Sequence, residues 1–255
     1  MADCLCIIPA RMASSRFSGK PLKPILGLAL VLHVFERCRL TPGVGRAVIA
    51  TCDDAIRRAA EAYGAEAVMT ADTHPGCIDR TDEAVGILAP DMPGDGFILM
   101  VQGDEVMVTP EMNAAVITGY GKGGAQVVNL ASKLTRPEDH DDPNCVKVVA
   151  APDGRAIYFS RAPIPSRART PGVAMHQQTG VIGFSKDFLK RFGTMPRTPL
   201  EVAEGIDMLR TLEHGLPVQM VFTHRETVGV DTPADLTRAE EMLRHDPATR
   251  RYLKF

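Results

Sequence analysis

The sequence lacks the features that mark several large classes of protein. No apolar run approaches the roughly 20 residues that a membrane-spanning helix needs. The first apolar run, residues 5–10, is too short for the core of a secretory signal, and Arg11 follows it at once. The formal net charge is only −2 over 255 residues, so bulk charge does not favour a nucleic acid or a membrane as partner. We therefore expect a soluble, cytoplasmic protein.

Cysteine patterns typical of zinc sites are also missing. The chain has six cysteines but no Cys-x-x-Cys pair, and the spacing of Cys4 and Cys6 does not suit zinc. Several cysteines lie in apolar runs, where a free thiol acts as a small hydrophobic side chain. A chain of this length buries roughly three-quarters of its unfolded surface without the help of disulfides. We expect all six thiols to be reduced.

Apolar runs and helical patterns alternate along the first half of the chain. Strands are predicted at residues 4–8, 47–51, 67–70 and 97–101, and helices at 24–39 and 53–63. This alternation is typical of βαβ units and a mainly parallel sheet. Further along, we expect strands at 126–130, 145–150, 156–159, 180–184 and 218–222, and helices at 199–214 and 233–244. Because no repeat or linker interrupts the pattern, the prediction is a single α/β domain over residues 1–255.

The loop after the first strand is rich in cations and small residues. Arg11, Arg16 and Lys20 lie within ten positions, and ligands of open α/β sheets gather at the carboxyl ends of strands. A triphosphate needs such charges, because its own charge must be neutralised before another anion can approach. Guanidinium and ammonium groups both suit phosphate oxygens. The loop is neither a Walker loop nor a Gly-x-Gly-x-x-Gly motif, and taken alone it could equally be a solvated basic face.

Two aspartates are candidates for a metal site. Asp104 follows the predicted strand at 97–101, and Asp231 precedes the last predicted helix. Carboxylates suit Mg²⁺, which usually binds one or two of them together with substrate phosphates. Each residue also has a structural explanation. Asp104 could cap a turn, and Asp231 or Thr232 could cap the helix.

Taken together, these runs resemble one family. The segments Pro-Ala-Arg-x-x-Ser-x-Arg-x-x-Gly-Lys-Pro-Leu (9–22), Val-Gln-Gly-Asp-Glu (101–105) and Gly-Val-Asp-Thr-Pro-x-Asp-Leu (229–236) are similar to those of the 3-deoxy-manno-octulosonate cytidylyltransferases. Three intermediate runs fit as well: 143–149, 158–165 and 209–215. The resemblance covers almost the whole chain in order, which makes it more specific than any single motif.

The resemblance implies a fold, a reaction and partners. The fold would be a Rossmann-like nucleotidyltransferase fold with a mixed, mainly parallel central sheet and a smaller subregion for dimerisation and acceptor binding. The reaction would join CMP from CTP to the anomeric hydroxyl of a sugar acid, with Mg²⁺ as cofactor and pyrophosphate as product. Such reactions activate sugar acids for lipopolysaccharide or capsule synthesis, and the family usually forms homodimers.

The resemblance also implies site residues, position by position. Arg11 and Lys20 would hold the CTP phosphates, and with Asp104 they form the catalytic set; Asp104 and Asp231 would bind the metal. The nucleotide would contact Ala10, Arg11, Ser14, Arg16, Lys20, Arg80 and Gln102. The acceptor would contact Gln102, Arg161, Gln178, Asp207 and Met208.

The sequence departs from the family pattern mainly on the acceptor side. Gln178 stands where the family usually has His, and His176, two positions earlier, is displaced by roughly 7 Å on a strand. Met208 replaces a Gln, and residues 74–80 read His-Pro-Gly-Cys-Ile-Asp-Arg in place of His-x-Ser-Gly-Thr-Glu-Arg. Sites that hydrogen-bond hydroxyls discriminate strongly, so we expect an acidic acceptor other than ordinary 3-deoxy-manno-octulosonate. The alternatives are a phosphonate or phosphate acceptor, or a non-catalytic nucleotide-binding protein on the same scaffold.

Overall fold

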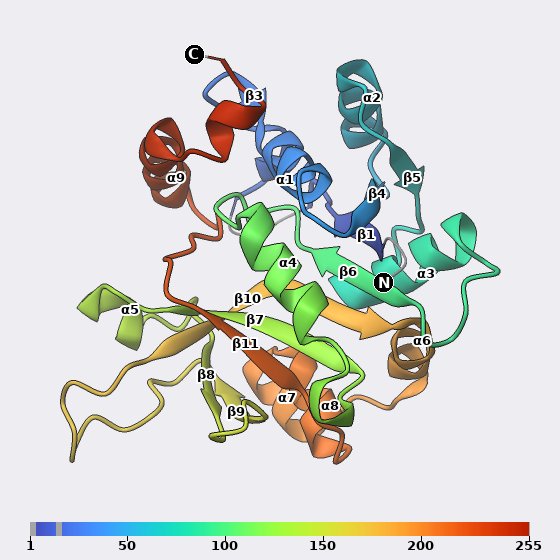
Figure 1. Cartoon of the computed structure of the whole chain (residues 1–255). Coiled ribbons are helices and arrows are strands. Elements are labelled where there is room, and N and C mark those ends of the chain that lie inside the picture. The colour runs from blue at the N-terminus through green and yellow to red at the C-terminus, as the bar shows by residue number, and fades with distance from the viewer. Residues whose placement is uncertain (1–3, 14–16, 255) are drawn as a thin grey trace.

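A mixed β-sheet forms the centre of the computed structural model, which describes residues 4–13 and 17–254. Its main path runs β11-β7-β10-β6-β1-β4-β5 (Figure 1). The strands are β1 (Cys4–Pro9), β4 (Val44–Thr51), β5 (Ala67–Met69), β6 (Phe97–Val101), β7 (Val127–Lys133), β10 (His176–Ser185) and β11 (Gln219–Thr223). Along this path four of the six pairings are parallel, and only β10 runs antiparallel to its neighbours. The mixed, mainly parallel sheet is therefore confirmed.

Helices cover both faces of the sheet because the strands are apolar on both sides. One face packs against α1 (Leu30–Arg39), α2 (Asp54–Tyr63), α4 (Pro110–Gly119) and α9 (Pro233–His245). The other packs against α3 (Cys77–Leu88), α6 (Lys186–Thr194) and α8 (Asp207–Glu213). In β1 the side chains alternate, with Cys6 and Ile8 on the first face and Leu5 and Ile7 on the second. Among the described helices, none is both long enough and apolar enough to span a bilayer.

Two predicted helices are wrong in part. The segment 24–39 begins with a short hairpin of β2 (Pro24–Ile25) and β3 (Leu28–Ala29), because Leu26 and Gly27 turn the chain at positive φ. The predicted helix 199–214 is two helices, α7 (Pro199–Glu204) and α8, separated where Gly205 takes a φ of 64°. Helices α3, α4 and α6, and the short α5 (Pro137–Asp141), have no counterpart among the helices expected from the sequence.

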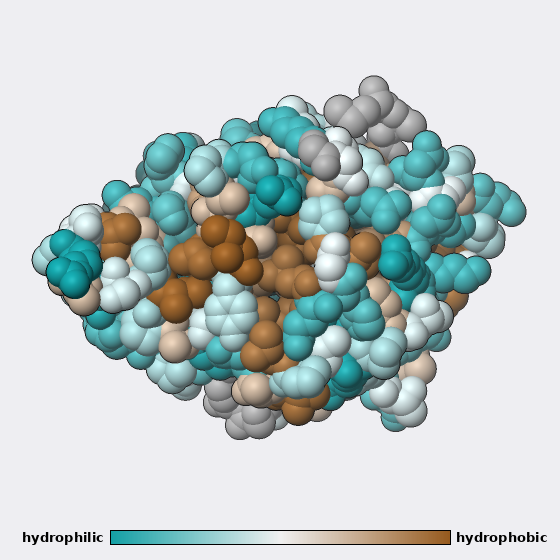
Figure 2. All heavy atoms as spheres, turned by 90° about the horizontal axis from the view of Figure 1, so that it is seen from below, coloured by the Kyte–Doolittle hydropathy of each residue, from teal (hydrophilic) through white to brown (hydrophobic). Residues whose placement is uncertain are grey.

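A smaller antiparallel branch leaves the main sheet beside β10. It consists of β8 (Lys147–Ala150) and β9 (Ala156–Ser160), and β8 pairs with both β9 and β10. The lower face of the molecule carries this branch and α7 (Figure 1). Figure 2 shows apolar side chains gathered near the middle of that face. The large apolar side chains exposed on these elements are Ile157 of β9 and Leu200 and Val202 of α7.

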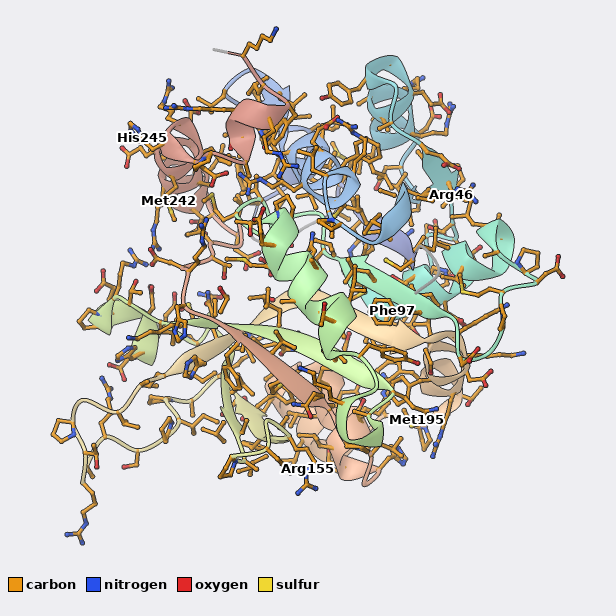
Figure 3. The ribbon with its side chains drawn as sticks, viewed as in Figure 1. Arg46, Phe97, Arg155, Met195, Met242 and His245 are labelled. Atoms are coloured by element: carbon orange, nitrogen blue, oxygen red, sulfur yellow. The ribbon has the colours of Figure 1, made fainter. Side chains whose placement is uncertain are left out.

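The end of the described chain packs back onto α1. After α9, which Met242 and His245 mark in Figure 3, residues 246–252 reach the buried side chains of Arg37 and His33. Arg37 pairs with Asp246 and also donates to the Thr249 hydroxyl at 2.9 Å. The Nδ1 atom of His33 lies 2.8 Å from the Tyr252 hydroxyl. Segments more than two hundred residues apart therefore share one polar cluster.

Candidate active site

Three residues from distant segments meet at one edge of the sheet. Lys20 begins a short 3₁₀ turn after the first loop, Asp104 follows β6, and Asp231 precedes α9. The Nζ atom of Lys20 lies 2.6 Å from Asp104 Oδ2 and 2.9 Å from Asp231 Oδ1. It also donates to the carbonyl of Val230 at 2.8 Å. The structure thus brings together the proposed phosphate-binding lysine and both candidate metal ligands.

Charge and partial burial hold this cluster together. Burial lowers the pKa of Lys20, but attraction to Asp104 and then to Asp231 outweighs it, so the pKa is raised. The lysine side chain is 12% exposed, while the two aspartates are 25% and 27% exposed. The carboxylates thus remain open to a ligand while the ammonium lies deeper.

Asp231 does not cap the helix that follows it. Thr232 is the N-cap of α9, and its hydroxyl accepts from the backbone N–H of Asp235. The Asp235 carboxylate in turn accepts from the N–H groups of Asp231 and Thr232. This capping box leaves the Asp231 side chain directed at Lys20, so the capping explanation for Asp231 is wrong.

The donor set at this edge suits a hard divalent cation. Two partly exposed carboxylates are what Mg²⁺ usually takes from a protein when phosphates supply further oxygens. Within residues 4–13 and 17–254, no three His, Cys, Asp or Glu side chains form a group that could hold a metal. Asp104 and Asp231 therefore fit Mg²⁺ only together with oxygens from a substrate.

Both aspartates line one cavity of about 410 Å³. The cavity lies beside the ends of β6 and β10 and continues towards α8. All five residues assigned to the acceptor by resemblance line it as well: Gln102, Arg161, Gln178, Asp207 and Met208. The fold therefore places the candidate metal ligands and the candidate acceptor residues around a single space.

Glycine at position 180 lets Gln102 lie against β10. A Cβ atom on Gly180 would come within 2.7 Å of the Gln102 side chain. The backbone N–H of Gly180 donates to Glu105 Oε1 at 2.5 Å. Burial, reinforced by the charge of Asp104, raises the pKa of Glu105 to about 7. Glu105 thus links the segment after β6 to β10 beside the cavity. We did not predict this role, although Glu105 directly follows Asp104 in the sequence.

Arg161 is held mainly by backbone oxygens. Its Nε donates to the carbonyl of Glu204 at 2.6 Å and its Nη1 to that of Pro143 at 2.8 Å. The buried Lys147 also fixes this region, because its ammonium donates to the carbonyls of Asp142, Cys145 and Arg161 at 2.6–2.8 Å. Lys147 was not predicted, although it lies within the run 143–149. Together these hydrogen bonds hold one side of the cavity in place.

The remaining acceptor-side residues have contrasting surroundings. Gln178 donates from Nε2 to Asn129 Oδ1 at 2.7 Å. The side chain of Met208 is fully buried at the cavity floor. Burial raises the pKa of Asp207, and the neighbouring charge of Glu201 adds to that shift. His176 points elsewhere, with its ring against Phe222.

Most of the residues that the resemblance assigns to the nucleotide lie within the described part of the chain. Ala10 is buried at the end of β1 and Arg11 is exposed. Arg80 is buried, and its guanidinium contacts the Thr70 hydroxyl and the carbonyl of Ala71. Ser14 and Arg16 lie outside the described residues. The carboxylate of Asp53 accepts from the N–H of Met12 at 2.7 Å and so anchors the start of the loop.

A mixed sheet flanked by helices, with lysine and carboxylates at its strand ends around one cavity, defines a nucleotidyltransferase of the Rossmann-like type. The family model described as Cytidylyltransferase matches residues 5–226. The chain belongs to this family.

Individual relatives match over nearly their whole length. The 3-deoxy-manno-octulosonate cytidylyltransferase of Anaeromyxobacter sp. (strain Fw109-5) is 40% identical, over 94% of this chain and 97% of the relative. The 8-amino-3,8-dideoxy-manno-octulosonate cytidylyltransferase of Shewanella sp. (strain ANA-3) is 34% identical, over 94% and 98%. A solved structure of CMP:2-keto-3-deoxy-manno-octonic acid synthetase complexed with CTP is 30% identical, with a TM-score of 0.86 over 95% of this chain and 99% of the other.

Proposed function

We propose that this cytidylyltransferase transfers CMP from CTP to a sugar acid of the 3-deoxy-ulosonate type and releases pyrophosphate. The observation that carries the proposal is the contact of Lys20 with both Asp104 and Asp231 at the cavity. Relatives that match almost the whole chain are named as cytidylyltransferases of octulosonates. The sheet edge therefore supplies a phosphate-binding cation beside two ligands for Mg²⁺.

The reaction is a displacement at the α-phosphorus of CTP. An acceptor hydroxyl oxygen forms the new P–O bond, its proton is lost, and the bond to the pyrophosphate oxygen breaks. Because a nucleophile approaches a group that is already negative, neutralising charge and positioning the reactants carry most of the catalysis. Lys20 and Arg11 hold the phosphates, and Asp104 and Asp231 would hold Mg²⁺. When bound there, the ion would supply positive charge that makes the acceptor hydroxyl more acidic and stabilises the leaving pyrophosphate.

The acceptor lies at the other end of the cavity in this proposal. Gln102 and Arg161 face its acidic part, and Gln178, Asp207 and Met208 surround the rest. Gln178 and Met208 take the places of a histidine and a glutamine that the family usually has. We infer that the preferred acceptor is related to, but distinct from, 3-deoxy-manno-octulosonate, because groups that hydrogen-bond hydroxyls set such preferences.

A pyrophosphate-release assay tests the function. The panel contains CTP and Mg²⁺ with 3-deoxy-manno-octulosonate, its 8-amino-3,8-dideoxy analogue, other ulosonic acids, and phosphonates and phosphorylated alcohols. We expect release with a sugar acid, dependent on Mg²⁺ and lost when CTP is replaced by ATP. Binding of CTP without release for any acceptor would instead identify a non-catalytic nucleotide-binding protein.

We propose a homodimer formed through the lower face. Ile157 of β9 and Val202 of α7 are 62% and 60% exposed, and both elements lie at this face (Figure 1). Figure 2 shows apolar surface near the middle of the same face. Contiguous apolar patches on soluble proteins commonly mark protein contacts. Sedimentation analysis of the wild type and of Val202→Lys tests this assignment.

We also place the enzyme in the cytoplasm, where CTP is available.

A further inference from the structure

Lys147 is a fully buried cation whose ammonium is bound by backbone oxygens. Its Nζ donates to the carbonyls of Asp142, Cys145 and Arg161 at 2.6, 2.7 and 2.8 Å. Within residues 4–13 and 17–254, this ammonium forms no ion pair with a carboxylate. Because a buried charge without a carboxylate partner costs stability, packing alone does not account for a lysine at this position.

The three carbonyls belong to the two segments that hold Arg161. One is the carbonyl of Arg161 itself, and the other two flank Pro143, whose own carbonyl accepts from Arg161 Nη1 at 2.8 Å. In the sheet, Lys147 of β8 is also paired with Ser160, the residue just before Arg161. Lys147 therefore fixes both the main chain of Arg161 and the turn, residues 142–145, that the guanidinium contacts.

The guanidinium of Arg161 keeps donors for a ligand. A guanidinium has five N–H groups, and three of these donate to the carbonyls of Glu204, Pro143 and Gly205 at 2.6, 2.8 and 3.4 Å. Among the described residues the remaining N–H groups have no acceptor, and Arg161 has no ion pair. Since Arg161 lines the cavity, these donors suit a carboxylate that enters it.

Positive charge is concentrated at this side of the cavity. Burial lowers the pKa of Lys147, and the charge of Arg161 acts in the same direction, so the two cations are near enough to interact. The carboxylates of Asp141 and Asp142 oppose this effect. The other cations that line the cavity are paired or exposed to solvent: Arg136 with Asp139, Arg238 with Glu226, and Lys133 at the surface. An acidic group in the cavity is therefore drawn to Arg161.

We propose that Lys147 is a positioning residue for the acceptor, which holds Arg161 ready to bind the acceptor carboxylate and adds its own charge behind it. This inference rests on the proposed function. Lys147 does not line the cavity, so it acts through Arg161 and the turn 142–145. Residues that hold a binding group in place in this way set how well the group meets its ligand.

The test measures kcat and KM for the acceptor, and the affinity for CTP, in wild type and Lys147→Met. The probes are 3-deoxy-manno-octulosonate and the other ulosonic acids of the panel, all of which carry a carboxylate. We expect KM for the acid to rise about tenfold or more, the size of a charge-assisted contact. The affinity for CTP should not change, because Lys20 and Asp104 lie on other segments. A merely structural lysine would lower the amount of folded enzyme, and so the apparent kcat, without raising KM.

A double-mutant cycle shows whether Lys147 acts through Arg161. If it does, Arg161→Met alone raises KM for the acid at least as much as Lys147→Met does, and the double variant has the KM of Arg161→Met. Two independent contributions would instead multiply, and a double variant with the product of both increases overturns the proposal.

Lys186→Met is the matched control. Lys186 also donates to three carbonyls, at 2.6–3.1 Å, but it does not line the cavity or contact Arg161. Its loss should lower the midpoint of thermal unfolding and leave KM for the acid unchanged. If Lys147→Met does not fold, Lys147→Gln takes its place, since it removes the charge and keeps an amide donor.

The outcomes separate this inference from the proposed function. A wild-type KM for the acid in the Lys147 variant, or an equal rise of KM in Lys186→Met, overturns the role of Lys147 and leaves the cytidylyltransferase intact. Absence of pyrophosphate release by the wild type with every acid overturns the proposed function itself.

Discussion

Lys20 lies between two carboxylates that the sequence separates by more than one hundred residues. Its ammonium reduces the repulsion between Asp104 and Asp231 and keeps both at the cavity. In the proposed reaction the two aspartates act as a unit, since each supplies part of a cation site that phosphates complete. The residue scale therefore offers the sharpest tests of the site.

Replacing Asp104 or Asp231 by Asn should nearly abolish turnover. Each change removes the charge of a proposed Mg²⁺ ligand but keeps the shape of the side chain, so the fold should remain. The measurement is kcat for pyrophosphate release over a range of Mg²⁺ concentrations, with thermal unfolding as the check on structure. Nearly full activity of either variant at saturating Mg²⁺ would remove that residue from the metal site.

Lys20→Ala and Arg11→Ala should weaken the use of CTP far more than the use of the acceptor. Both cations are proposed to contact phosphate, and a charge-assisted contact corresponds to roughly tenfold or more in affinity. Titration calorimetry with a non-hydrolysable CTP analogue gives the affinity, and Lys23→Ala, an exposed lysine next to the same loop, is the matched control. Affinity and turnover equal to wild type in both variants would refute the assignment of this loop to phosphates.

His33 should make stability depend on pH in a defined window. Burial, together with the charge of Arg37, lowers its pKa to about 4 against the opposing effect of the Ile25 carbonyl. The folded protein therefore favours the neutral ring. The stability that the neutral ring contributes is fully present above the unfolded pKa of 6.5 and is lost as pH falls towards about 4.

The measurement is the free energy of unfolding of wild type and His33→Gln between pH 7.5 and about 4, obtained with urea. A difference of one pKa unit corresponds to about 1.4 kcal/mol. The wild type should therefore lose a few kcal/mol of unfolding free energy relative to His33→Gln as pH falls through this range. Carboxylates titrate in both proteins and cancel in the comparison. Parallel curves throughout this range would show that His33 is not held neutral by the fold.

At the scale of elements, the positions of strands were easier to predict than the ends of helices. The run 97–101 became β6 with the predicted bounds, because five apolar residues in a row are typical of a short strand buried on both faces. The helical pattern over 199–214 continued through Gly205, whose left-handed conformation ends α7. Periodicity reports which face is buried and does not show where the chain turns.

The break at Gly205 places α7 and α8 side by side around a buried ion pair. Arg210 of α8 binds Glu201 of α7 through two hydrogen bonds, and its guanidinium also lies 4.2 Å from the ring centre of Phe192. Glu201 is fully buried, and its Oε2 also accepts from the backbone N–H of Thr198, the N-cap of α7, at 3.2 Å. The pair therefore fixes the helix that carries Asp207 and Met208.

Arg210→Met should destabilise the fold by about 3–5 kcal/mol, because it leaves the buried Glu201 carboxylate with the exposed Arg197 as its remaining charged partner. The double variant Glu201→Met/Arg210→Met should recover a large part of this loss. Urea unfolding of the four proteins of this cycle gives the coupling between the two residues. A double variant no more stable than Arg210→Met would show that the uncompensated charge is not the cause.

At the scale of the whole molecule, the sequence predicted which residues come together at the cavity better than it predicted their contacts. Asp104 and Asp231 were each ambiguous between a metal ligand and a cap, since spacing along the chain does not show which strand ends meet. Tertiary structure decided this for Asp231 by giving the cap of α9 to Thr232. Supporting residues such as Glu105 and Lys147 were not predicted, because they act through backbone groups that no motif displays.

The polar cluster that joins the two ends of the fold should matter for global stability. Asp246→Ala leaves Arg37, which is 1% exposed, without its carboxylate, so we expect a loss of about 3–5 kcal/mol. Glu240→Ala removes the partner of the exposed Arg244 on the same helix and should cost no more than about 0.5 kcal/mol. Thermal and urea unfolding measure both. Equal losses of unfolding free energy for the two substitutions would show that the buried Arg37–Asp246 pair stabilises the fold no more than an exposed pair does.

These long-range contacts also set an order in time. Arg37 and Asp246 are 209 residues apart, and Lys20 and Asp231 are 211 apart. At a synthesis rate of about 5–20 residues per second, Asp246 and Asp231 are therefore added roughly 10–40 s after Arg37 and Lys20. Until then α1 carries an unneutralised guanidinium, and the loop that holds Lys20 has no Asp231 to bind. The stability of the fold and the capacity to hold its substrate are therefore completed within the same short interval of translation.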